Sequence, residues 1–343
     1  MEERRVTQSL AVKYRPTTFD DVTEQESIKT ILSYQLSSGE VKNAYLFCGG
    51  AGTGKTTCAR IFARAINKGQ GNPIELDAAS NNSVEDVREI ITRAKTSSVE
   101  SEYKVFILDE VHMLSNSAWN AMLKLLEEPP IKSIFIMCTT DPQKIPKTIL
   151  SRVQRYDFQR ISQKGIVDRL AYILGQEDMR ARGSQEESIA YIAKLADGGM
   201  RDAITLLDKC LAYSTDLTID NITKALGLAD FSQMVQLSKA IYTKDVVNVI
   251  YIIESIHSSG KDLKQFIKQF LGFTLDTIKY MVTDSLSCTS IPTSMKDELY
   301  LADPHVASGL LETLVRLNAE IKWDSSPKAI IEAELLLYME EQK

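Results

Sequence analysis

Residues 49–56 have the spacing of a phosphate-binding loop. They read Gly-Gly-Ala-Gly-Thr-Gly-Lys-Thr, which fits a glycine, four residues and then Gly-Lys-Ser/Thr. Glycines in such a loop let successive backbone N–H groups point inward at an anion without steric hindrance. The lysine of the pattern reaches the β- and γ-phosphates, and the hydroxyl after it binds Mg²⁺. We therefore predict these roles for Lys55 and Thr56, and binding of a nucleoside triphosphate with Mg²⁺.

The flanking sequence supplies the strand and the helix that this loop requires. Residues 44–48 are an apolar run typical of a buried strand, and apolar residues recur at helical spacing behind the loop. The start of that helix adds the positive end of its dipole to the anion site. A glycine-rich turn that binds nothing would not require the Lys-Thr pair. The residues expected to contact the phosphates are Gly50, Ala51, Gly52, Thr53, Gly54, Lys55, Thr56 and Thr57.

Two carboxylates follow the next strongly apolar segment. Residues 105–108 are typical of a buried parallel strand, and Asp109 and Glu110 come directly after them. Ligands of open α/β sheets bind at the carboxyl ends of the strands, so we expect this pair beside the phosphate loop. We assign Asp109 to the Mg²⁺ shell and Glu110 to polarising the attacking water. Taken alone, an acidic loop after a core strand is the less favoured alternative.

A third apolar run, residues 133–138, ends in Thr139 and Thr140. A polar side chain at the end of this strand would lie beside the γ-phosphate and could hold the attacking water. A threonine that merely caps the strand end is the alternative, and the local sequence does not decide between the two.

Composition and charge limit the other functions open to the chain. Its 343 residues suggest two or three domains, and a net charge of −6 argues against a basic nucleic-acid binder, so any DNA contact must be local or shared with partners. No apolar run approaches the roughly 20 residues of a membrane span, and residues 1–5 lack the apolar core of a signal peptide. The five cysteines include no Cys-x-x-Cys pair, and the three histidines are scattered. We expect a cytoplasmic protein with reduced, inert thiols and no membrane contact.

The order of the apparent elements indicates an α/β domain followed by helices. Up to about residue 161, short apolar strands alternate with helices, which is typical of a parallel sheet. Residues 74–77 resemble another strand, and Ser83 followed by Asp86 approximates a capping box for a helix that ends near Lys95. Beyond residue 161 the strand signals fade. The helices expected there span residues 166–174, 185–196, 203–213, 231–242, 246–258, 263–282, 306–318 and 328–341.

With these pieces placed, the chain resembles the gamma/tau family, the ATPase subunits of the bacterial DNA polymerase III clamp loader. The resemblance runs nearly end to end. It implies an AAA+ P-loop domain with a parallel sheet at residues 1–162, a small helical lid at 163–226, and an all-helical collar that mediates oligomerisation at 227–343. The motifs that carry it are residues 13–16, 19–22, 109–115, 123–130, 139–146, 149–152, 199–203 and 317–327.

The resemblance also implies roles that the local sequence does not reveal. Arg152, in a Ser-Arg motif, would reach the γ-phosphate bound by a neighbouring subunit, as an arginine finger does. Arg201 would be the second sensor, a lid arginine that contacts ATP of its own subunit, and Thr140 would be the first sensor. Without the family, both arginines read as ordinary surface or helix-start residues. The adenine pocket would be lined by Tyr14, Arg15, Pro16 and Val22.

Several departures from the family pattern carry information. Residues 67–73 run straight from the P-loop helix to the next strand, where the family usually has a cysteine-rich insert, so no zinc is expected. The turn after the adenine motif reads Thr23-Glu24-Gln25 in place of Val-Gly-Gln. The chain stops where the collar is expected to end, as a short gamma-like form would. At the expected DNA-facing positions, family members often carry basic residues where this chain has the neutral Asn81, Asn82, Ser83 and Asn116, whereas Arg88 is retained.

The function that the resemblance implies is an ATP-driven motor of a sliding-clamp loader. The expected partners are delta-like and delta-prime-like subunits and further copies of this chain in a pentameric ring, together with the sliding clamp and primer-template DNA. A scaffold subunit that does not hydrolyse ATP is one alternative, although it would not need Lys55, Thr56, Asp109 and Glu110. Another AAA+ machine, such as a branch-migration ATPase, is a second alternative. It would need a pore loop or DNA hairpin of its own, and no inserted segment is visible in the sequence.

Overall fold

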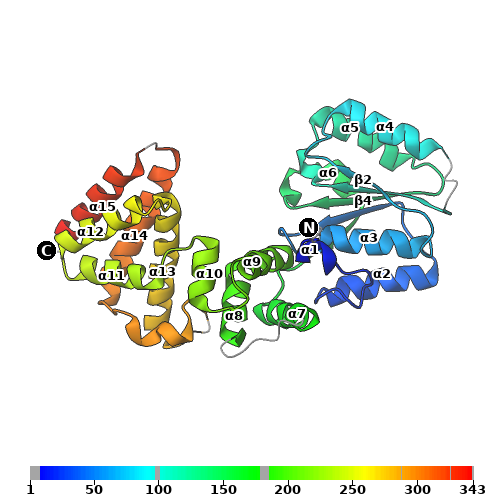
Figure 1. Cartoon of the computed structure of the whole chain (residues 1–343). Coiled ribbons are helices and arrows are strands. Elements are labelled where there is room, and N and C mark those ends of the chain that lie inside the picture. Colours follow the sequence, from blue (N-terminus) through cyan, green and yellow to red (C-terminus); the bar gives the residue numbers. More distant parts are fainter. Residues whose placement is uncertain (1–7, 97–100, 178–184, 287, 325, 342–343) are drawn as a thin grey trace, which may run out of the picture. The chain divides into compact units, whose positions relative to one another are not determined.

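The computed structural model describes residues 8–96, 101–177, 185–286, 288–324 and 326–341. The chain divides into two compact units (Figure 1). The first comprises Met1–Asp178 and Ala196–Asp208, and the second comprises Met179–Leu195 and Lys209–Lys343.

The first unit is built on a five-stranded parallel sheet with the order β2-β3-β4-β1-β5. This confirms the parallel sheet that the alternating strands and helices predict. The order places β4 between β3 and β1, so the segments that follow these three strands meet at one edge of the sheet. The strands are β1 (Ala44–Cys48), β2 (Ile74–Asp77), β3 (Lys104–Asp109), β4 (Ser133–Thr139) and β5 (Gln154–Asp157).

Helices cover both faces of this sheet because the central strands are apolar on both sides. Alternate residues point to opposite faces, so Tyr45 and Phe47 of β1 join one core and Leu46 joins the other. Helices α2 and α3 pack on the first face, and α4 and α5 on the second, as Figure 1 shows. The helices of this unit are α1 (Leu10–Lys13), α2 (Glu26–Ser38), α3 (Lys55–Ile66), α4 (Val84–Lys95), α5 (Asn116–Glu127), α6 (Lys147–Leu150), α7 (Gln163–Gln176) and the first part of α9 (Met200–Tyr213).

The capping box predicted for α4 is confirmed. The Ser83 hydroxyl accepts the N–H of Asp86 at 3.2 Å, and the Asp86 carboxylate accepts the N–H of Ser83 at 3.0 Å. Ser115 caps α5 in a similar way by accepting the N–H of Ala118 at 3.2 Å. The N–H of Ser115 donates to the carbonyl of Asn82 at 3.1 Å, so the two helix starts are joined directly.

The second unit is helical and has one extensive core. Its apolar side chains come mainly from α11 to α15, including Phe266 and Phe270 of α13 and Leu314 of α14. The sequence prediction placed α11 and α12 at the observed residues but missed the short α10. The helices here are α8 (Gln185–Leu195), the end of α9, α10 (Ile219–Leu226), α11 (Phe231–Tyr242), α12 (Val246–Ser258), α13 (Leu263–Thr283), α14 (Pro304–Glu320) and α15 (Pro327–Glu341). Among the described residues, no helix combines the length and the apolar character that a membrane span requires.

Candidate nucleotide-binding site

The sheet order brings the predicted chemical groups together at the carboxyl ends of β1, β3 and β4. Thr56, in the first turn of α3, donates its hydroxyl to the Asp109 carboxylate at 2.7 Å. Thr140, after β4, donates its hydroxyl to the Glu110 carboxylate at 2.9 Å. These contacts join residues that are far apart in the sequence, and they place a hydroxyl–carboxylate pair suited to Mg²⁺ beside a second carboxylate suited to orienting water.

The loop between β1 and α3 has the conformation that anion binding requires. Gly52 and Gly54 have φ angles of 69° and 101°, a region that favours glycine. A Cβ on Gly52 would lie 3.0 Å from the Cα of Gly199, so this position is also crowded by the segment that precedes α9. The hydroxyl of Thr53 closes the loop by donating to the carbonyl of Gly50 at 2.9 Å. The loop is therefore shaped by its own contacts to present backbone donors.

The ammonium of Lys55 is the electrostatic centre of this loop. Only 6% of the residue is exposed, and the ammonium donates to the carbonyls of Gly49 at 2.9 Å and Gly50 at 2.7 Å. Burial lowers the pKa of Lys55, and the charges of groups such as Glu110 and Asp109 oppose that shift. A buried cation hydrogen-bonded to neutral carbonyls has much to gain from an anion. The residues present therefore fit a triphosphate, held by Lys55 and the loop amides, with Mg²⁺ between Thr56 and Asp109.

A cavity of about 430 Å³ surrounds these groups. It is closed on one side by the loop and the carboxylates, and on the other by residues of the N-terminal segment and the start of α9. Most of the predicted nucleotide contacts line it. Those residues are Tyr14, Arg15, Pro16, Ala51, Gly52, Thr53, Gly54, Lys55, Thr56, Thr57, Asp109, Glu110 and Arg201.

Three family models match the chain in consecutive segments. Residues 74–162 match the DNA polymerase III delta subunit, residues 165–216 match the ATPase lid domain of the DNA polymerase III clamp loader subunit, and residues 217–314 match domain III of DNA polymerase III subunits gamma and tau. DNA polymerase III subunit gamma of Buchnera aphidicola is 36% identical over 288 residues, which cover 78% of this chain and 79% of that protein. The chain belongs to the gamma/tau family of DNA polymerase III subunits.

Other relatives of this gamma/tau chain are longer than it is. DNA polymerase III subunit tau of Bacillus subtilis is 37% identical over 352 residues, which cover 95% of this chain but 62% of that protein. For subunit tau of Escherichia coli the identity is 34%, and the coverage is 77% of this chain and 44% of that protein. Among solved structures, the RuvB Holliday junction branch migration motor of Thermotoga maritima matches 75% of this chain and 90% of its own, with a TM-score of 0.53 and 20% identity. That similarity concerns the fold alone, an AAA+ P-loop domain followed by helical domains.

Three residues predicted for the nucleotide site of this gamma/tau chain, Gly50, Val22 and Thr140, do not line the cavity. Val22 is 7% exposed and packs in the core beneath α2, where it borders a neighbouring cavity. Thr140 does not line the cavity and reaches it through Glu110. Val22 therefore packs in the core and does not line the nucleotide cavity.

Arg152 also lies away from its own chain's cavity. Its guanidinium contacts the Glu127 carboxylate at 2.7 Å and donates to the carbonyl of Thr148 at 2.8 Å. Its side chain is 35% exposed, so the ion pair with Glu127 is accessible to water and weak. Arg152 is absent from the lining of its own chain's cavity.

Sequence reasoning missed several residues that shape the cavity. Arg169 of α7 lines it and donates to the carbonyl of Tyr14 at 2.8 Å. Met200 donates its N–H to the carbonyl of Gly52 at 3.0 Å and so joins the start of α9 to the loop. Arg169 stands in an ordinary amphipathic helix, where no local pattern marks it. The remaining lining residues outside the prediction are Ala11, Thr23, Arg60, Ile161, Asp202 and Ile204.

His112 is a further unpredicted neighbour of the Glu110 carboxylate. Its Nδ1 lies 3.3 Å from the Glu110 carboxylate and 3.2 Å from the hydroxyl of Thr139. Glu110 itself has a φ of 49°, a left-handed conformation that a residue with a side chain adopts only when its surroundings hold it. Thr140 and His112 supply that hold, so the carboxylate of Glu110 has a defined position.

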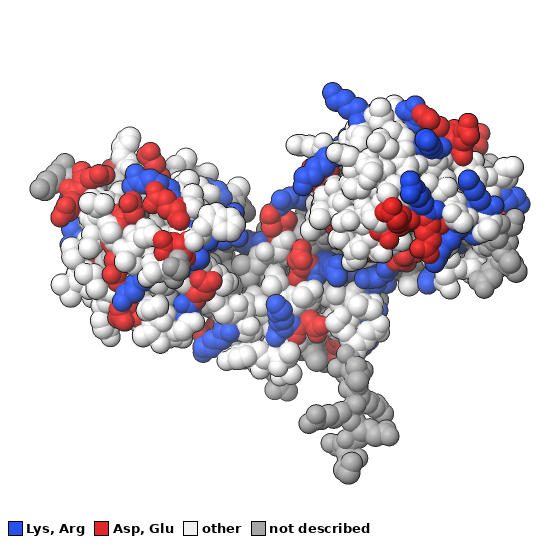
Figure 2. Space-filling view, turned by 90° about the horizontal axis from the view of Figure 1, so that it is seen from above, with Lys and Arg blue, Asp and Glu red and all other residues white. Residues whose placement is uncertain are grey.

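The predicted DNA-facing residues cluster at the starts of α4 and α5. Asn82, Arg88 and Asn116 are exposed, and Ser83 is occupied in capping α4. The guanidinium of Arg88 lies 3.7 Å from the Glu85 carboxylate, and both side chains are largely in solvent. Figure 2 shows acidic and basic side chains interspersed on the visible face, in agreement with the net charge of −6.

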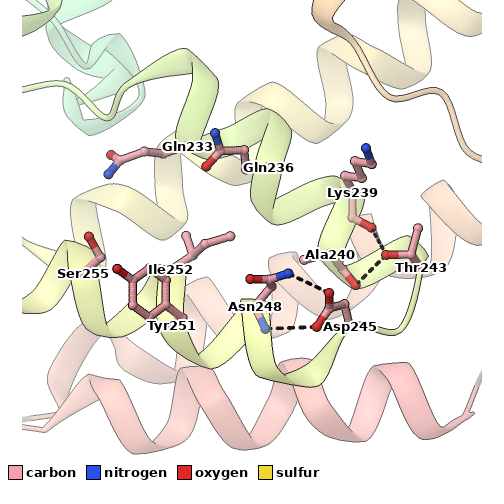
Figure 3. A pocket seen from close by; sticks show the side chains of 10 residues that line it. All are labelled: Gln233, Gln236, Lys239, Ala240, Thr243, Asp245, Asn248, Tyr251, Ile252 and Ser255. Atoms are coloured by element: carbon pink, nitrogen blue, oxygen red, sulfur yellow. Dashed lines mark hydrogen bonds between the residues drawn. The ribbon is translucent and has the colours of Figure 1, made fainter.

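The second unit has a cavity of about 370 Å³ between α11 and α12 (Figure 3). Asp245 is engaged within its own helix, because its carboxylate accepts the N–H of Asn248 at 3.1 Å and its side-chain amide at 2.6 Å. Lys239 is the one cation among the lining residues, and none of them belongs to a glycine-rich loop. The lining residues of this cavity include no counterpart of the glycine-rich loop or of the Thr56–Asp109 pair of the first unit.

Three cysteines of the first unit, Cys48, Cys58 and Cys138, are buried. Burial raises the pKa of the Cys48 thiol to about 11 and that of Cys58 to about 12, and it raises the pKa of Cys138 as well. A raised pKa favours the thiol over the nucleophilic thiolate, so burial makes these cysteines less reactive. Within the described parts of the chain, no group of three or more His, Cys, Asp or Glu side chains is placed to hold a metal ion by itself. Residues 67–73 lead from α3 to β2.

Proposed function

We propose that this gamma/tau chain is the ATP-driven motor subunit of a sliding-clamp loader. It binds ATP with Mg²⁺, hydrolyses it at the interface with a neighbouring subunit, and couples the cycle to opening the clamp and placing it on primer-template DNA. The observation that carries the proposal is the pairing of Thr56 with Asp109 and of Thr140 with Glu110, both beside the buried Lys55. A subunit that only shaped the ring would need neither pair.

The polar residues at the expected phosphate position each have a role in this proposal. Lys55 and the amides of residues 50–56 bind the phosphates, and Arg201 contacts them from the start of α9. Thr56 and Asp109 would hold Mg²⁺, and the bound ion would supply positive charge to neutralise the charge that develops on the transferred phosphoryl group. Glu110 orients the attacking water and accepts its proton, and Thr140 and His112 keep the Glu110 carboxylate in place.

The partners follow from the family and from the position of Arg152. Because Arg152 lies outside its own cavity, we assign it to the ATP of a neighbouring subunit in a pentameric ring. The ring would contain further copies of this chain with delta-like and delta-prime-like subunits, and it would act on a sliding clamp. The helical second unit would provide the collar.

Two other functions remain as competitors. A scaffold subunit would bind its partners without hydrolysing ATP. A different AAA+ machine, such as a branch-migration motor, would hydrolyse ATP but would be indifferent to a sliding clamp. The fold similarity to RuvB does not favour the second, because the identity is 20% whereas subunit tau of Bacillus subtilis is 37% identical.

Steady-state ATP hydrolysis distinguishes these possibilities. The purified chain is assayed alone, with loader partner subunits, and then with the cognate clamp and primed DNA. A clamp-loader motor should hydrolyse ATP slowly alone and be strongly stimulated only when clamp and primed DNA are both present. Absence of hydrolysis in every mixture would favour the scaffold, and hydrolysis that ignores the clamp would favour another AAA+ machine.

Arg88 provides a separate prediction about DNA. Binding of primed DNA by the assembled loader should weaken as salt rises, and Arg88→Ala should reduce the slope of log affinity against log salt by roughly one ion for each copy that contacts a phosphate. Arg93→Ala is the matched control, because Arg93 lies in the last turn of the same helix and is paired with Glu89 at 2.6 Å. An equal change in the salt slope for Arg88→Ala and Arg93→Ala would contradict the proposal that Arg88 contacts DNA.

A further inference from the structure

Two successive residues near the nucleotide cavity have backbones that glycine would adopt more easily. Glu24 and Gln25 have φ angles of 57° and 59°, although neither is glycine. Such a conformation persists only where the surroundings over-determine it. The contacts of these two side chains should therefore explain why Glu24 and Gln25 hold the left-handed conformation.

The carboxylate of Glu24 is bound to the start of α7. It accepts the N–H of Ser162 at 3.1 Å and also accepts the Ser162 hydroxyl. Ser162 is the N-cap of α7, and its oxygen accepts the N–H of Gly165 at 3.0 Å. A carboxylate in this position also benefits from the positive end of the helix dipole.

Gly165 shows that the space is reserved for this carboxylate. Glycine is unfavourable inside a helix, and Gly165 lies in the first turn of α7. A Cβ on Gly165 would lie 2.6 Å from the Oε1 atom of Glu24, so any larger residue would displace the carboxylate. Two locally unfavourable choices, a left-handed glutamate and a helical glycine, are thus explained by a single contact.

The same short segment is tied to the start of α9. Gln25 exchanges two hydrogen bonds with the backbone of Gln159, at 2.7 and 3.1 Å. Next to Ser162, the N–H of Ile161 donates to the carbonyl of Gly198 at 3.1 Å, and Gly198 lies two residues before α9. Residues 159–162 therefore stand between the N-terminal wall of the cavity, which includes Thr23, and the turn that carries Arg201.

From these contacts we infer that Glu24 is a positioning residue, which sets Arg201 against the P-loop by holding the N-cap of α7. The inference rests on the proposed function, since it assumes that Arg201 contacts the γ-phosphate of ATP. Loss of the Glu24 contact removes the restraint on Ser162 at the end of residues 159–162. Because Ile161 is hydrogen-bonded to Gly198, the turn before Arg201 loses part of its restraint as well. ATP should then lose more affinity than ADP, because ADP lacks the phosphate that Arg201 reads.

The test compares equilibrium affinities for ATP and ADP in the full chain. Glu24→Gly removes the carboxylate and relaxes the left-handed backbone, so the variant should fold, with a melting temperature as the check. We expect its preference for ATP over ADP to fall by roughly three- to tenfold, the size of effect that a single coupling residue typically transmits. Gly165→Ala should also lower the preference for ATP over ADP, because its Cβ would displace the Glu24 carboxylate, although alanine favours the helix more than glycine does. Glu24→Gln, which keeps an acceptor oxygen, should retain most of the preference.

A double-mutant cycle with Arg201→Ala separates positioning from general stability. In the Arg201→Ala background, Glu24→Gly should change the ratio no further, because the group that it positions is gone. An unchanged ratio in Glu24→Gly, an equal loss in both backgrounds, or equal wild-type affinity for the two nucleotides would overturn the inference. Failure of the wild-type chain to bind either nucleotide would instead refute the proposed function itself.

Discussion

Replacing Glu110 with glutamine is expected to slow ATP hydrolysis by about 10²- to 10⁴-fold, the usual contribution of a general base. Glutamine keeps the shape of the side chain and can still accept the hydroxyl of Thr140, which lies 2.9 Å from the carboxylate. It cannot accept a proton from water. Binding should persist because Lys55, the loop and the Thr56–Asp109 pair are untouched. Single-turnover hydrolysis, measured beside equilibrium ATP affinity, separates the two effects.

Glu89→Gln is the matched control for this substitution. Glu89 is an exposed glutamate of α4 paired with Arg93, away from the cavity, and its replacement should leave both hydrolysis and binding at wild-type values. If Glu110→Gln instead weakened ATP binding severely and left the hydrolysis rate of bound ATP unchanged, Glu110 would be a binding residue and not the general base. Thr140→Ala should lower the rate less than Glu110→Gln, because it loosens the carboxylate without removing it.

The parts of the site that could be predicted from sequence are those whose chemistry is local. The loop from Gly50 to Thr56 carries its own conformational signal, and Asp109 and Glu110 directly follow an apolar strand. Their proximity follows from a general rule, that ligands gather at the carboxyl ends of parallel strands. The contacts of Thr56 with Asp109 and of Thr140 with Glu110 agree with that expectation.

The parts that could not be predicted depend on contacts between distant segments. Arg169 is marked only by its hydrogen bond to Tyr14, 155 residues away in the sequence. The resemblance places Val22 in the adenine pocket, yet its side chain packs in the core. Strand β5 escaped notice because Gln154 and Arg155 are polar, and the strand is defined by its pairing with β1. No period of hydrophobic residues reveals such contacts.

Glu24 illustrates the same limit from the opposite direction. The sequence shows a glutamate where a turn would favour glycine, which marks an anomaly but not its cause. The cause is the N-cap of α7, which is 138 residues further along the chain. A local conflict of this kind, resolved only by tertiary structure, is where functional positioning is most often found.

The Arg152→Ala variant is the second prediction with a large expected effect. In the assembled loader with clamp and primed DNA, hydrolysis should fall by roughly 10³- to 10⁵-fold, the range seen for arginine fingers in other NTPases. Nucleotide affinity of the isolated chain should not change, because Arg152 lies outside its own cavity and pairs with Glu127. That pair is 35% exposed on the arginine side, so it costs little to break when Arg152 turns to a neighbour. Steady-state hydrolysis and nucleotide titration give the two readouts.

Mixed assemblies decide whether Arg152 acts across the interface. A chain with Arg152→Ala keeps its own phosphate site, and a chain with Lys55→Ala keeps its finger, so each is inactive alone. Mixed rings should regain part of the stimulated rate, because some interfaces then combine an intact site with an intact finger. Arg155→Ala is the control, since Arg155 pairs with Asp157 on its own strand and should leave the rate unchanged. Mixtures that stay as inactive as their components would place the action of Arg152 within its own subunit, although it does not line that subunit's cavity.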